Sequence, residues 1–408
     1  MRHTIAAVSL ALALVAALPA DWPQWRGPHR DGRVEGFDAP AHWPDQLRKG
    51  WSIEVGEGHS SPLAVGDTVF QLSRQGEEEV IRALTLADGR VLWRVAYPAP
   101  YTMNPAARGH GKGPKSTPAY AAGKLYTLGI SGILSCFDAS SGKLVWRKDF
   151  TGQFSATSPL YGAGMSPAVV DGRVLVHIGG PGSGALLALD ADSGEPIWQW
   201  TEDGPGYASP IVATLDGARQ VLTQTEKFVV GVDFATGHTL WKIPFSTAYD
   251  QNSLTPVLLD DLLIYSGTRQ PTVAVRIGHS GGKWTTEKVW SNPEIPMYMS
   301  TPALHGDLLF GLTQNDKGAL FCADARTGKL LWKGSPRQGD NASLLVSGDL
   351  LLALTTEAEL IVAKASGADL SVIQTYEVAA SNVWAHPALI GPYILIKDAT
   401  TLTRWSVE

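Results

Sequence analysis

Short apolar runs, interrupted by Gly, Asp and Ser, recur along almost the whole chain. Residues 300–334 show one unit of the pattern: a Ser-Thr-Pro-Ala-Leu start is followed by apolar stretches at 308–313, 319–325 and 330–334. Runs of four to eight residues bounded by turn residues are typical of β-strands. One unit therefore predicts four short antiparallel strands, which together form one small β-sheet.

The turn before the fourth strand carries a repeated motif close to Asp-Ala-x-Ser/Thr-Gly-Lys-x-x-Trp. In five places a glycine is followed four residues later by a tryptophan: Gly89/Trp93, Gly142/Trp146, Gly194/Trp198, Gly237/Trp241 and Gly328/Trp332. The aspartate can accept backbone N–H groups of the turn, and the glycine can adopt the positive φ that the turn requires. Each motif therefore predicts a tight β-hairpin.

A four-stranded sheet of this size cannot bury both faces alone, so the copies must pack around an axis, as in a β-propeller. The tryptophans recur about every 40–50 residues, which is the length of one propeller blade. First strands are expected near Ser60, Ser116, Ser166, Ser209, Thr255, Ser300, Ala342 and His386. The sequence predicts an all-β, eight-bladed β-propeller of four-stranded antiparallel blades, with seven blades as the alternative.

The two ends of the chain are expected to complete one blade together. Residues 51–55 form a fourth strand without three strands before it, whereas residues 387–407 supply three strands without a fourth. Joining the N- and C-terminal strands closes the ring and leaves no open edge. The expected organisation is a signal peptide at 1–20, an extended segment at 21–50 and the propeller at 51–408.

The repeated tryptophans are expected to pack between adjacent blades, where the indole N–H can reach a backbone carbonyl. Structural docking is assigned to Trp93, Trp146, Trp198, Trp241 and Trp332. Blades five and seven are expected to be irregular. An insertion separates Gly281-Gly282 from Trp290, and Ser371 stands where blade seven should have its tryptophan.

Composition and the first residues bear on the compartment. A basic start, an apolar stretch at 5–18 and Pro19-Ala20 are typical of a secretory signal peptide, and the stretch is too short for a spanning helix. No cysteine follows the expected cut, so a periplasmic or secreted protein without a lipid anchor is predicted. The net charge of −6 disfavours nucleic acid as a partner. We expect a monomer.

The only two cysteines are Cys136 and Cys322, which occupy equivalent positions in blades two and six. These blades lie on opposite sides of an eight-bladed ring, far beyond the reach of a disulfide. Both side chains are therefore expected to be small buried hydrophobic groups.

The repeat resembles the pyrroloquinoline quinone (PQQ) type propeller repeat with its tryptophan-docking motif. That repeat is shared by quinoprotein alcohol dehydrogenases and by the propeller subunit of the outer-membrane barrel-assembly machinery. The resemblance covers residues 51–408 and implies the fold more than the function, since the family contains enzymes and scaffolds.

The head segment, Trp22 to Gly32, is similar to the start of a large group of exported bacterial PQQ-like propeller proteins. With two tryptophans, two prolines and little periodicity, it cannot fold alone. We expect it to lie extended against the propeller with Trp22 and Trp25 buried. The alternative is a docking peptide for a partner.

Propellers bind ligands at the mouth of the central channel, which the first strands and the loops before them line. The residues there include donors, acceptors and aromatic rings: His59, His110, Lys115, Tyr161, Tyr207, Asn252, Tyr298, Asn341, Trp384 and His386. This set could hold a flat polar anion or a sugar, with Lys112 and Lys115 as the candidate anion ligands and the loop 97–115 as a candidate cap. Alternatively, these residues and the Ser/Thr-Pro starts satisfy backbone groups at the crowded axis.

For a dehydrogenase, the resemblance implies PQQ and a calcium held by a carboxylate, an amide and the quinone, with a catalytic aspartate and two adjacent cysteines. The adjacent cysteines are missing, and the acidic residues near the expected mouth reduce to Asp250 and Asp340. Calcium takes six or more oxygen ligands, usually including carboxylates. PQQ with calcium is therefore a candidate that the ligand residues do not support, and Asp250 with Asn252 is a thin calcium site.

No His-Glu-x-x-His metal motif and no paired-cysteine zinc spacing occur in the chain. His59, His110 and His386 would meet if neighbouring blades bring them together, which leaves a metal or acid/base role open. The leading hypothesis is an exported binding or scaffold protein whose partner is an envelope protein, a small polar ligand or a sugar. The alternatives are a diverged quinoprotein alcohol or sugar dehydrogenase and a polysaccharide-binding module.

Overall fold

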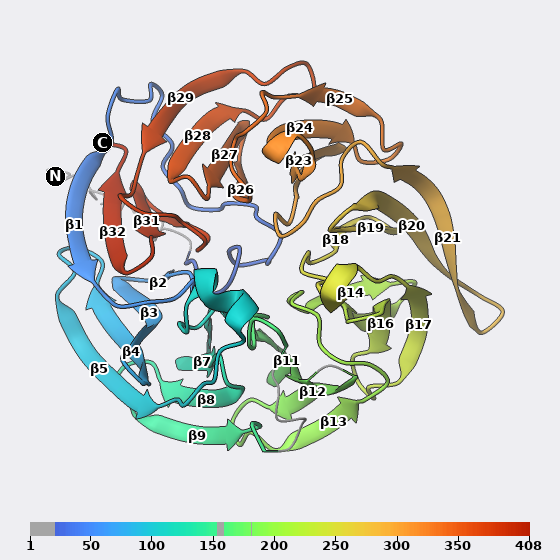
Figure 1. The fold of residues 1–408 in the computed structure, drawn as a ribbon, viewed down its shortest axis with the longest axis horizontal. Helices are drawn as coiled ribbons and strands as arrows, with labels where there is room; N and C mark the ends of the chain where they lie inside the picture. Colours follow the sequence, from blue (N-terminus) through green and yellow to red (C-terminus); the bar gives the residue numbers. More distant parts are fainter. Residues whose placement is uncertain (1–20, 153–158, 181) are drawn as a thin grey trace, which may run out of the picture.

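The computed structural model describes residues 21–152, 159–180 and 182–408, so the expected signal peptide lies outside the described residues. The described chain forms eight four-stranded sheets around a central axis (Figure 1). Each sheet is antiparallel, and in all but the eighth blade the strands follow one another in sequence from the axis outwards. The prediction of an eight-bladed all-β propeller is confirmed, and the seven-bladed alternative is wrong.

The strands of the first four blades are the following. Blade one contains β2 (Leu63–Val65), β3 (Thr68–Gln75), β4 (Glu78–Thr85) and β5 (Val91–Pro98). Blade two contains β6 (Ala119–Ala121), β7 (Lys124–Leu128), β8 (Ile133–Asp138) and β9 (Leu144–Asp149). Blade three contains β10 (Ala168–Val170), β11 (Arg173–Gly180), β12 (Ser183–Asp190) and β13 (Pro196–Trp200). Blade four contains β14 (Ile211–Leu215), β15 (Ala218–Gln224), β16 (Phe228–Asp233) and β17 (Thr239–Pro244).

The remaining blades complete the ring. Blade five contains β18 (Val257–Leu259), β19 (Leu262–Gly267), β20 (Gln270–Ser280) and β21 (Lys283–Asn292). Blade six contains β22 (Ala303–His305), β23 (Leu308–Thr313), β24 (Ala319–Asp324) and β25 (Leu330–Lys333). Blade seven contains β26 (Ala342–Ser347), β27 (Leu350–Thr355), β28 (Glu359–Lys364) and β29 (Val372–Glu377). Blade eight contains β30 (Ala388–Ile390), β31 (Tyr393–Lys397), β32 (Thr401–Ser406) and β1 (Arg48–Glu54).

Blade eight joins the two ends of the chain, as predicted. Strand β1 pairs antiparallel with β32, with Ser52 opposite Thr403. The hydroxyl groups of these two residues are 2.9 Å apart. Figure 1 shows β1 lying beside β32 at the outer edge of the ring. This pairing gives the last blade its fourth strand and closes the ring.

Helical structure in the described residues is confined to three short 3₁₀ turns in loops. These are η1 (Pro105–His110), η2 (Ala248–Asp250) and η3 (Asn315–Lys317). No helix in the described part of the chain is long and apolar enough to span a membrane.

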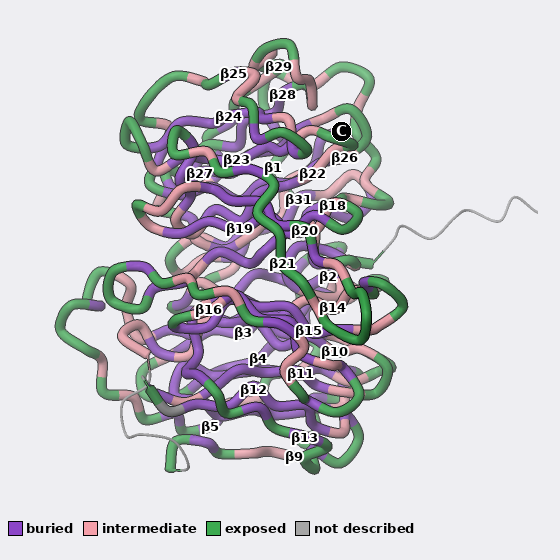
Figure 2. The backbone as a smooth tube through the Cα atoms, turned by 90° about the vertical axis from the view of Figure 1, so that its right-hand side faces the viewer, coloured by how far each residue is buried: buried purple, intermediate pink, exposed green. Residues whose placement is uncertain are grey.

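The hydrophobic core is divided into layers between neighbouring blades. Figure 2 shows the strands of the interior buried and the connecting loops exposed. One cluster contains Leu134 and Trp146 of blade two together with Val176 and Leu187 of blade three. Each blade thus buries its faces against its two neighbours, which explains why the repeat cannot fold as a single sheet.

The Asp-Gly turns have the predicted geometry. The Oδ1 atom of Asp138 accepts a hydrogen bond of 2.9 Å from the backbone N–H of Ser141, and Asp324 accepts one of 2.8 Å from Thr327. The turn glycines Gly142 and Gly328 both have φ near +73°. The contacts that form these turns are thus made within the motif itself.

Most of the tryptophans dock on the following blade. The indole Nε1 donates to a backbone carbonyl of the next blade in these pairs: Trp93 to Ala139 at 3.0 Å, Trp146 to Ala191 at 2.9 Å, Trp198 to Phe234 at 3.0 Å and Trp332 to Ser366 at 2.8 Å. The rings of Trp93, Trp146 and Trp198 also cover the turn glycine of that blade, where an added Cβ would lie 2.7 to 2.8 Å away. The glycine therefore serves both its own turn and the packing of the preceding blade.

Trp241 departs from this pattern. The prediction that its indole N–H reaches a backbone carbonyl of the adjacent blade is wrong. Its Nε1 donates to Oε1 of Gln220 in its own blade, at 2.7 Å. The physical reason lies in blade five, where β20 and β21 continue as a long hairpin to Gly281-Gly282 and the short Asp-Gly turn is missing. The insertion thus disturbs the tryptophan that precedes it.

Trp290 itself docks like the regular copies, contrary to the irregularity expected there. Its Nε1 donates to the carbonyl of Ala325 at 2.9 Å, and its ring covers Gly328. In addition, Trp51 of β1 donates to the carbonyl of Leu86 in blade one at 2.9 Å. The docking contact thus continues across the closure of the ring.

Both cysteines are unpaired and buried, as predicted. Burial raises the pKa of the Cys136 thiol to about 11 and that of the Cys322 thiol to about 12. Both groups are therefore neutral thiols near neutral pH and are part of the core.

The N-terminal segment, residues 21–47, runs along one end of the propeller. The carbonyl of Trp22 accepts from Ala64 in β2 at 3.0 Å, and the N–H of Val34 donates to Val346 in β26 at 2.8 Å. The N–H of Asp38 donates to Gly391 beside β30 at 2.9 Å. Trp22 is fully buried and Trp25 is 9% exposed. The segment thus packs on the propeller and uses both tryptophans as anchors.

Candidate functional site

A ring of hydroxyl groups surrounds the central axis at the start of the innermost strands. In each case the backbone N–H of one blade donates to a Ser or Thr hydroxyl of a neighbouring blade. The pairs are His386 to Ser61, Ser61 to Thr117, Thr117 to Ser166, Ser166 to Ser209, Ser209 to Thr255 and Thr255 to Thr301, at 2.8 to 3.2 Å. The structural role considered for the Ser/Thr-Pro starts is therefore confirmed for these hydroxyls.

Inside this ring lies a cavity of about 170 Å³. All six hydroxyl residues line it, together with residues of the loops that precede the innermost strands. A hydroxyl that accepts a backbone N–H keeps its own hydrogen as a donor. The ring can therefore present donors to whatever occupies the cavity.

Aromatic rings form the wall of the cavity near its mouth. His110 contacts Trp384 with ring centroids 4.9 Å apart and Tyr161 with centroids 5.2 Å apart, in both cases edge to face. Tyr161 in turn contacts Tyr207 at 5.8 Å, and the backbone N–H of Tyr161 donates to the Tyr207 hydroxyl at 3.1 Å. The loops that precede four different blades thus build one continuous wall.

The N-terminal segment forms the opposite end of the cavity. Trp25 lines the cavity and meets the ring of His386 edge to face, with centroids 5.5 Å apart. Beside it, Arg26 is fully buried and donates to the carbonyls of Thr301 at 2.7 Å and Pro302 at 2.6 Å. This segment spans the axis and closes the channel at this end.

Arg30 holds the segment to the other side of the ring. Its guanidinium donates to the carbonyls of Ser166 and Pro167 in blade three, both at 2.9 Å, and to Pro210 of blade four at 3.1 Å. Burial lowers the pKa of Arg30 to about 9 and that of Arg26 to about 10, so both remain charged near neutral pH. Two buried cations therefore lie beneath the cavity.

The histidines of the cavity are neutral. Burial is the main cause that lowers the pKa of His59 to about 3, and the charge of Lys115 acts in the same direction. Burial also lowers the pKa of His386 well below its ordinary value, with a further contribution from Arg26. The Nε2 of His59 and the Nδ1 of His386 are buried without a hydrogen-bond partner.

The structure brings together eight of the ten sequence-predicted site residues around this cavity. They are His59, His110, Lys115, Tyr161, Tyr207, Asn341, Trp384 and His386. Tyr298 lies at an adjacent hollow that also touches His110 and Trp384, and its hydroxyl donates to Gln251 at 2.6 Å. The candidate cap is represented by η1, which ends at His110, a residue that lines the cavity.

Asn252 lies outside the cavity, and its side chain is bound to backbone carbonyls of blade four. Its Nδ2 donates to the carbonyls of Thr225 at 2.8 Å and Phe245 at 2.9 Å, and the next residue, Ser253, lines the cavity instead. Alternation of side chains along an extended backbone explains this exchange, because neighbouring residues point in opposite directions.

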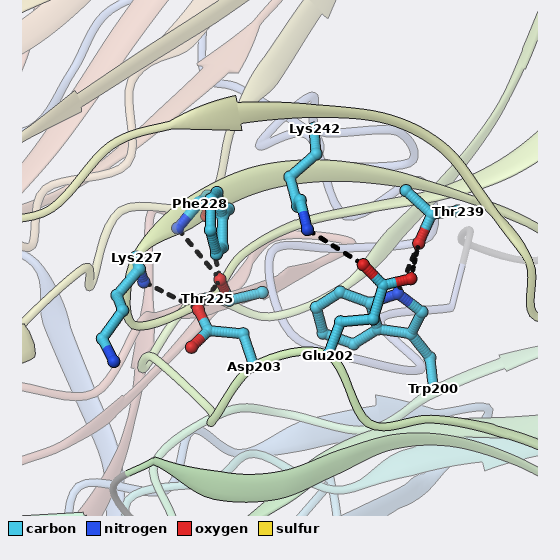
Figure 3. A network of polar contacts seen from close by, with 8 residues as sticks. All are labelled: Trp200, Glu202, Asp203, Thr225, Lys227, Phe228, Thr239 and Lys242. Atoms are coloured by element: carbon cyan, nitrogen blue, oxygen red, sulfur yellow. Dashed lines mark hydrogen bonds and ion pairs between the residues drawn. The ribbon is translucent and has the colours of Figure 1, made fainter.

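The acidic residues of the loop before blade four, Glu202 and Asp203, form hydrogen bonds and an ion pair within the fold (Figure 3). The Oδ2 of Asp203 accepts from the Thr225 hydroxyl at 2.5 Å and from the Lys227 N–H at 2.8 Å. Glu202 is paired with Lys242 at 2.9 Å. These contacts anchor the loop that carries Tyr207 to the cavity, and they keep both carboxylates away from it.

The donors present do not fit PQQ with calcium. Among the described residues that line the cavity, none is Asp or Glu, although carboxylates are the ligands calcium usually takes. Asp250 is exposed on η2, Asp340 lies at the adjacent hollow, and the described residues contain no group of three or more His, Cys, Asp or Glu placed to hold a metal. The closed end is filled by Trp25, and the space that remains is small.

Sequence reasoning missed the residues that close the channel. Trp25 was expected to be buried, but its place at the axis, and the roles of Arg26 and Arg30, were not predicted. Two arginines within a short segment that also carries two tryptophans were the available signal. The carbonyls through which they hold the propeller lie more than 130 positions away in the chain, so no local pattern could identify them.

Known proteins support this description of the fold and place the chain in a family. The PQQ_2 family, described as "Outer membrane protein assembly factor BamB", matches residues 76–334. The BamB of Shewanella oneidensis is 30% identical over 295 residues, which cover 66% of this chain and 69% of that protein.

Two solved structures share the fold at low identity. A quinohemoprotein alcohol dehydrogenase from Comamonas testosteroni matches with a TM-score of 0.70 at 14% identity, covering 97% of this chain and 81% of that chain. BamB from Moraxella catarrhalis matches with a TM-score of 0.61 at 17% identity, covering 88% and 99%. The resemblance inferred from the tryptophan motif is thus confirmed, and the chain belongs to the PQQ_2 family of outer membrane protein assembly factor BamB.

Proposed function

We propose that this protein is a non-catalytic binding or scaffold protein of the bacterial cell envelope that works through the channel mouth and its loops. The proposal includes export by a signal peptide at 1–20, a periplasmic or secreted location and a monomeric state. Membership of the BamB family supports a scaffold role.

The observation that carries the proposal is the lining of the cavity. It combines aromatic faces, hydroxyl groups and one lysine, and the described lining contains no acidic residue. Such surfaces recognise polar ligands by stacking and hydrogen bonding. A quinoprotein dehydrogenase would need calcium ligands at this place, so the lining favours binding over oxidation.

A second candidate is recognition of a sugar, which the aromatic wall favours. The rings of Trp384, Tyr161 and Tyr207 border the cavity beside the hydroxyl ring. Aromatic faces with nearby polar groups suit a ligand that has an apolar face and several hydroxyls. A sugar could be the ligand of a binding module or the group that a scaffold recognises.

Site-specific photo-crosslinking in the envelope tests the binding role. A photoreactive residue would replace Tyr249, which is 83% exposed in the loop that leads to cavity-lining Ser253. The matched control replaces Leu144, which is 44% exposed on the outer strand β9. We expect a discrete envelope-protein adduct, identified by mass spectrometry, at position 249 only. Absence of an adduct at 249, or equal adducts at both positions, would contradict the use of the mouth.

A further inference from the structure

Lys115 is a cation without a matching anion. It lines the cavity, and the partner of its Nζ is the carbonyl of Gly111 at 3.4 Å. The nearby Lys112 differs, since its Nζ is paired with Glu77 at 3.2 Å. Burial lowers the pKa of Lys115 to about 8, and no ion pair within the described residues involves it. Lys115 is partly buried, and a partly buried charge without an ionic partner is costly, so an anionic ligand would be stabilised there.

The surrounding charges do not cancel this effect. Arg26 lies beneath the cavity, and the buried Lys397 donates to the carbonyls of Gly58, Asp398 and Ala399 at 2.8 to 3.0 Å. The carboxylates that act on these cations are those of Asp31 for Arg26 and of Asp398, Glu54 and Glu57 for Lys397. None of these carboxylates lines the cavity, whereas the cations lower the pKa of its histidines. The cavity is therefore electropositive.

Residues that line the cavity also carry hydrogen-bonding groups that are not fully used. The Nε2 of His59 and the Nδ1 of His386 are buried without partners, and both rings are neutral. The hydroxyls of Ser61, Thr117 and Ser166 accept backbone N–H groups and keep a hydrogen to donate. A ligand that satisfies them needs several oxygen atoms spread over its surface.

Size limits the ligand further. The cavity measures about 170 Å³, which is below the roughly 300–1,000 Å³ of pockets for drug-sized ligands. A single ring with short substituents fits this space, whereas a large planar polycycle does not. The aromatic wall formed by Trp384, His110 and Tyr161 offers a surface for one face of such a ring.

We propose that the cavity binds a sugar acid, a monosaccharide-sized ring that carries one carboxylate. The carboxylate pairs with Lys115, the sugar hydroxyls meet the hydroxyl ring and the two unpartnered histidine nitrogens, and one sugar face packs on the aromatic wall. This inference rests on the proposed use of the channel mouth and adds the chemical class of its ligand. Several acceptors on one ring distinguish a sugar acid from the single terminal carboxylate of a peptide.

Calorimetric titration of the full chain tests the proposal with three probes: D-glucuronate, D-glucose and N-acetyl-alanyl-alanine. A charge-assisted hydrogen bond to Lys115 should make glucuronate bind about tenfold or more tightly than glucose. Lys115→Met should remove that preference and leave the two sugars within about threefold of each other, because only the ammonium distinguishes them. Lys112→Met, on the same loop, should keep the wild-type preference.

Four results would overturn the proposal. They are equal binding of both sugars by the wild type, no detectable binding of glucuronate, tighter binding of the dipeptide than of glucuronate, and a preference that survives Lys115→Met. Thermal melting shows whether Lys115→Met is folded, and Lys115→Arg, which retains the charge, should restore the preference if it is. Because crosslinking at Tyr249 does not depend on the sugar, failure here with a persisting envelope adduct rejects the ligand class alone.

Discussion

The indole ring of Trp290 covers Gly328 of the following blade, and its Nε1 donates to Ala325 in the same turn at 2.9 Å. A Cβ atom at Gly328 would lie 2.5 Å from the ring, and the glycine has φ +73°. One position thus meets two requirements, since the turn needs a positive φ and the preceding blade needs the space. In this motif the glycine therefore contacts the preceding blade, and the tryptophan four residues later contacts the following blade.

Replacing this glycine should therefore cost more than backbone strain. Gly328→Ala is expected to lower the free energy of unfolding by about 3 kcal/mol, because the methyl group displaces the Trp290 ring and the positive φ is strained. Gly306→Ala is the matched control: its φ is +55°, but nothing lies within 4 Å of an added Cβ. Its cost should be about 1 kcal/mol. Urea denaturation measures both, and equal losses would show that the indole contact contributes nothing.

The arginines beneath the cavity should hold the N-terminal segment in place. Arg30→Met is expected to destabilise the segment by about 3 kcal/mol, because three buried carbonyls lose a charged donor. Limited proteolysis should then cut within residues 21–40 faster than in the wild type. Arg33→Met is the control, since Arg33 is exposed and its guanidinium pairs with Asp31 of the same segment. Unchanged cleavage in the Arg30 variant would assign the anchoring to Trp22 and Trp25 instead.

His177 should make the protein less stable in acid. It is buried in blade three and its pKa is lowered to about 4, mainly by burial. The unfolded state takes up the proton at a higher pH than the folded state. The stability that His177 contributes is therefore fully present above pH 6.5 and is lost as the pH falls towards 4. His177 alone should contribute a slope of up to about 1.4 kcal/mol per pH unit in that window.

His177→Gln should flatten the pH dependence, and the exposed His42→Gln should leave it unchanged. Thermal melting between pH 7 and 4 provides the comparison. An identical slope in the His177 variant would mean that other groups cause the acid sensitivity.

Anion binding in the cavity should weaken at alkaline pH, because Lys115 loses its charge there. Its pKa is lowered to about 8, and binding a carboxylate requires the ammonium form. The binding constant for glucuronate should therefore be level below pH 8 and should fall above it, by up to about tenfold per pH unit. Titrations of the wild type from pH 6 to 10 measure this, and Lys115→Arg should remain level over that range. A level profile in the wild type would exclude the Lys115 ammonium as the anion ligand.

The fold could be predicted from the sequence because the residues that form its turns and its contacts between blades lie close together in the chain and recur in most blades. Asp324, Gly328 and Trp332 lie within nine positions, and the same grouping recurs around the ring. The irregular copy was harder, because the partner of Trp241 depends on the hairpin length of another blade. Trp290 was expected to be the disturbed residue, whereas the turn before it affects the preceding tryptophan.

The site could be predicted in part, for a related reason. Residues that stand just before the innermost strands must lie near the axis, which located His59, Lys115 and Trp384. Asn252 and Ser253 show the limit of this argument, because a shift of one residue exchanges the side chain that faces the cavity. The closed end depends on contacts between distant parts of the chain, such as Arg26 with Thr301, and these have no local signature.

The segment that carries Trp25 makes the central channel a dead end. A ligand must enter and leave by the same mouth, so nothing is translocated along the axis and a linear polymer cannot thread through the ring. If a polysaccharide is recognised, only its terminal residue can enter, and recognition is end-on. Each propeller then holds one chain end at a time, so the amount bound depends on the number of chain ends and not on the length of the chains.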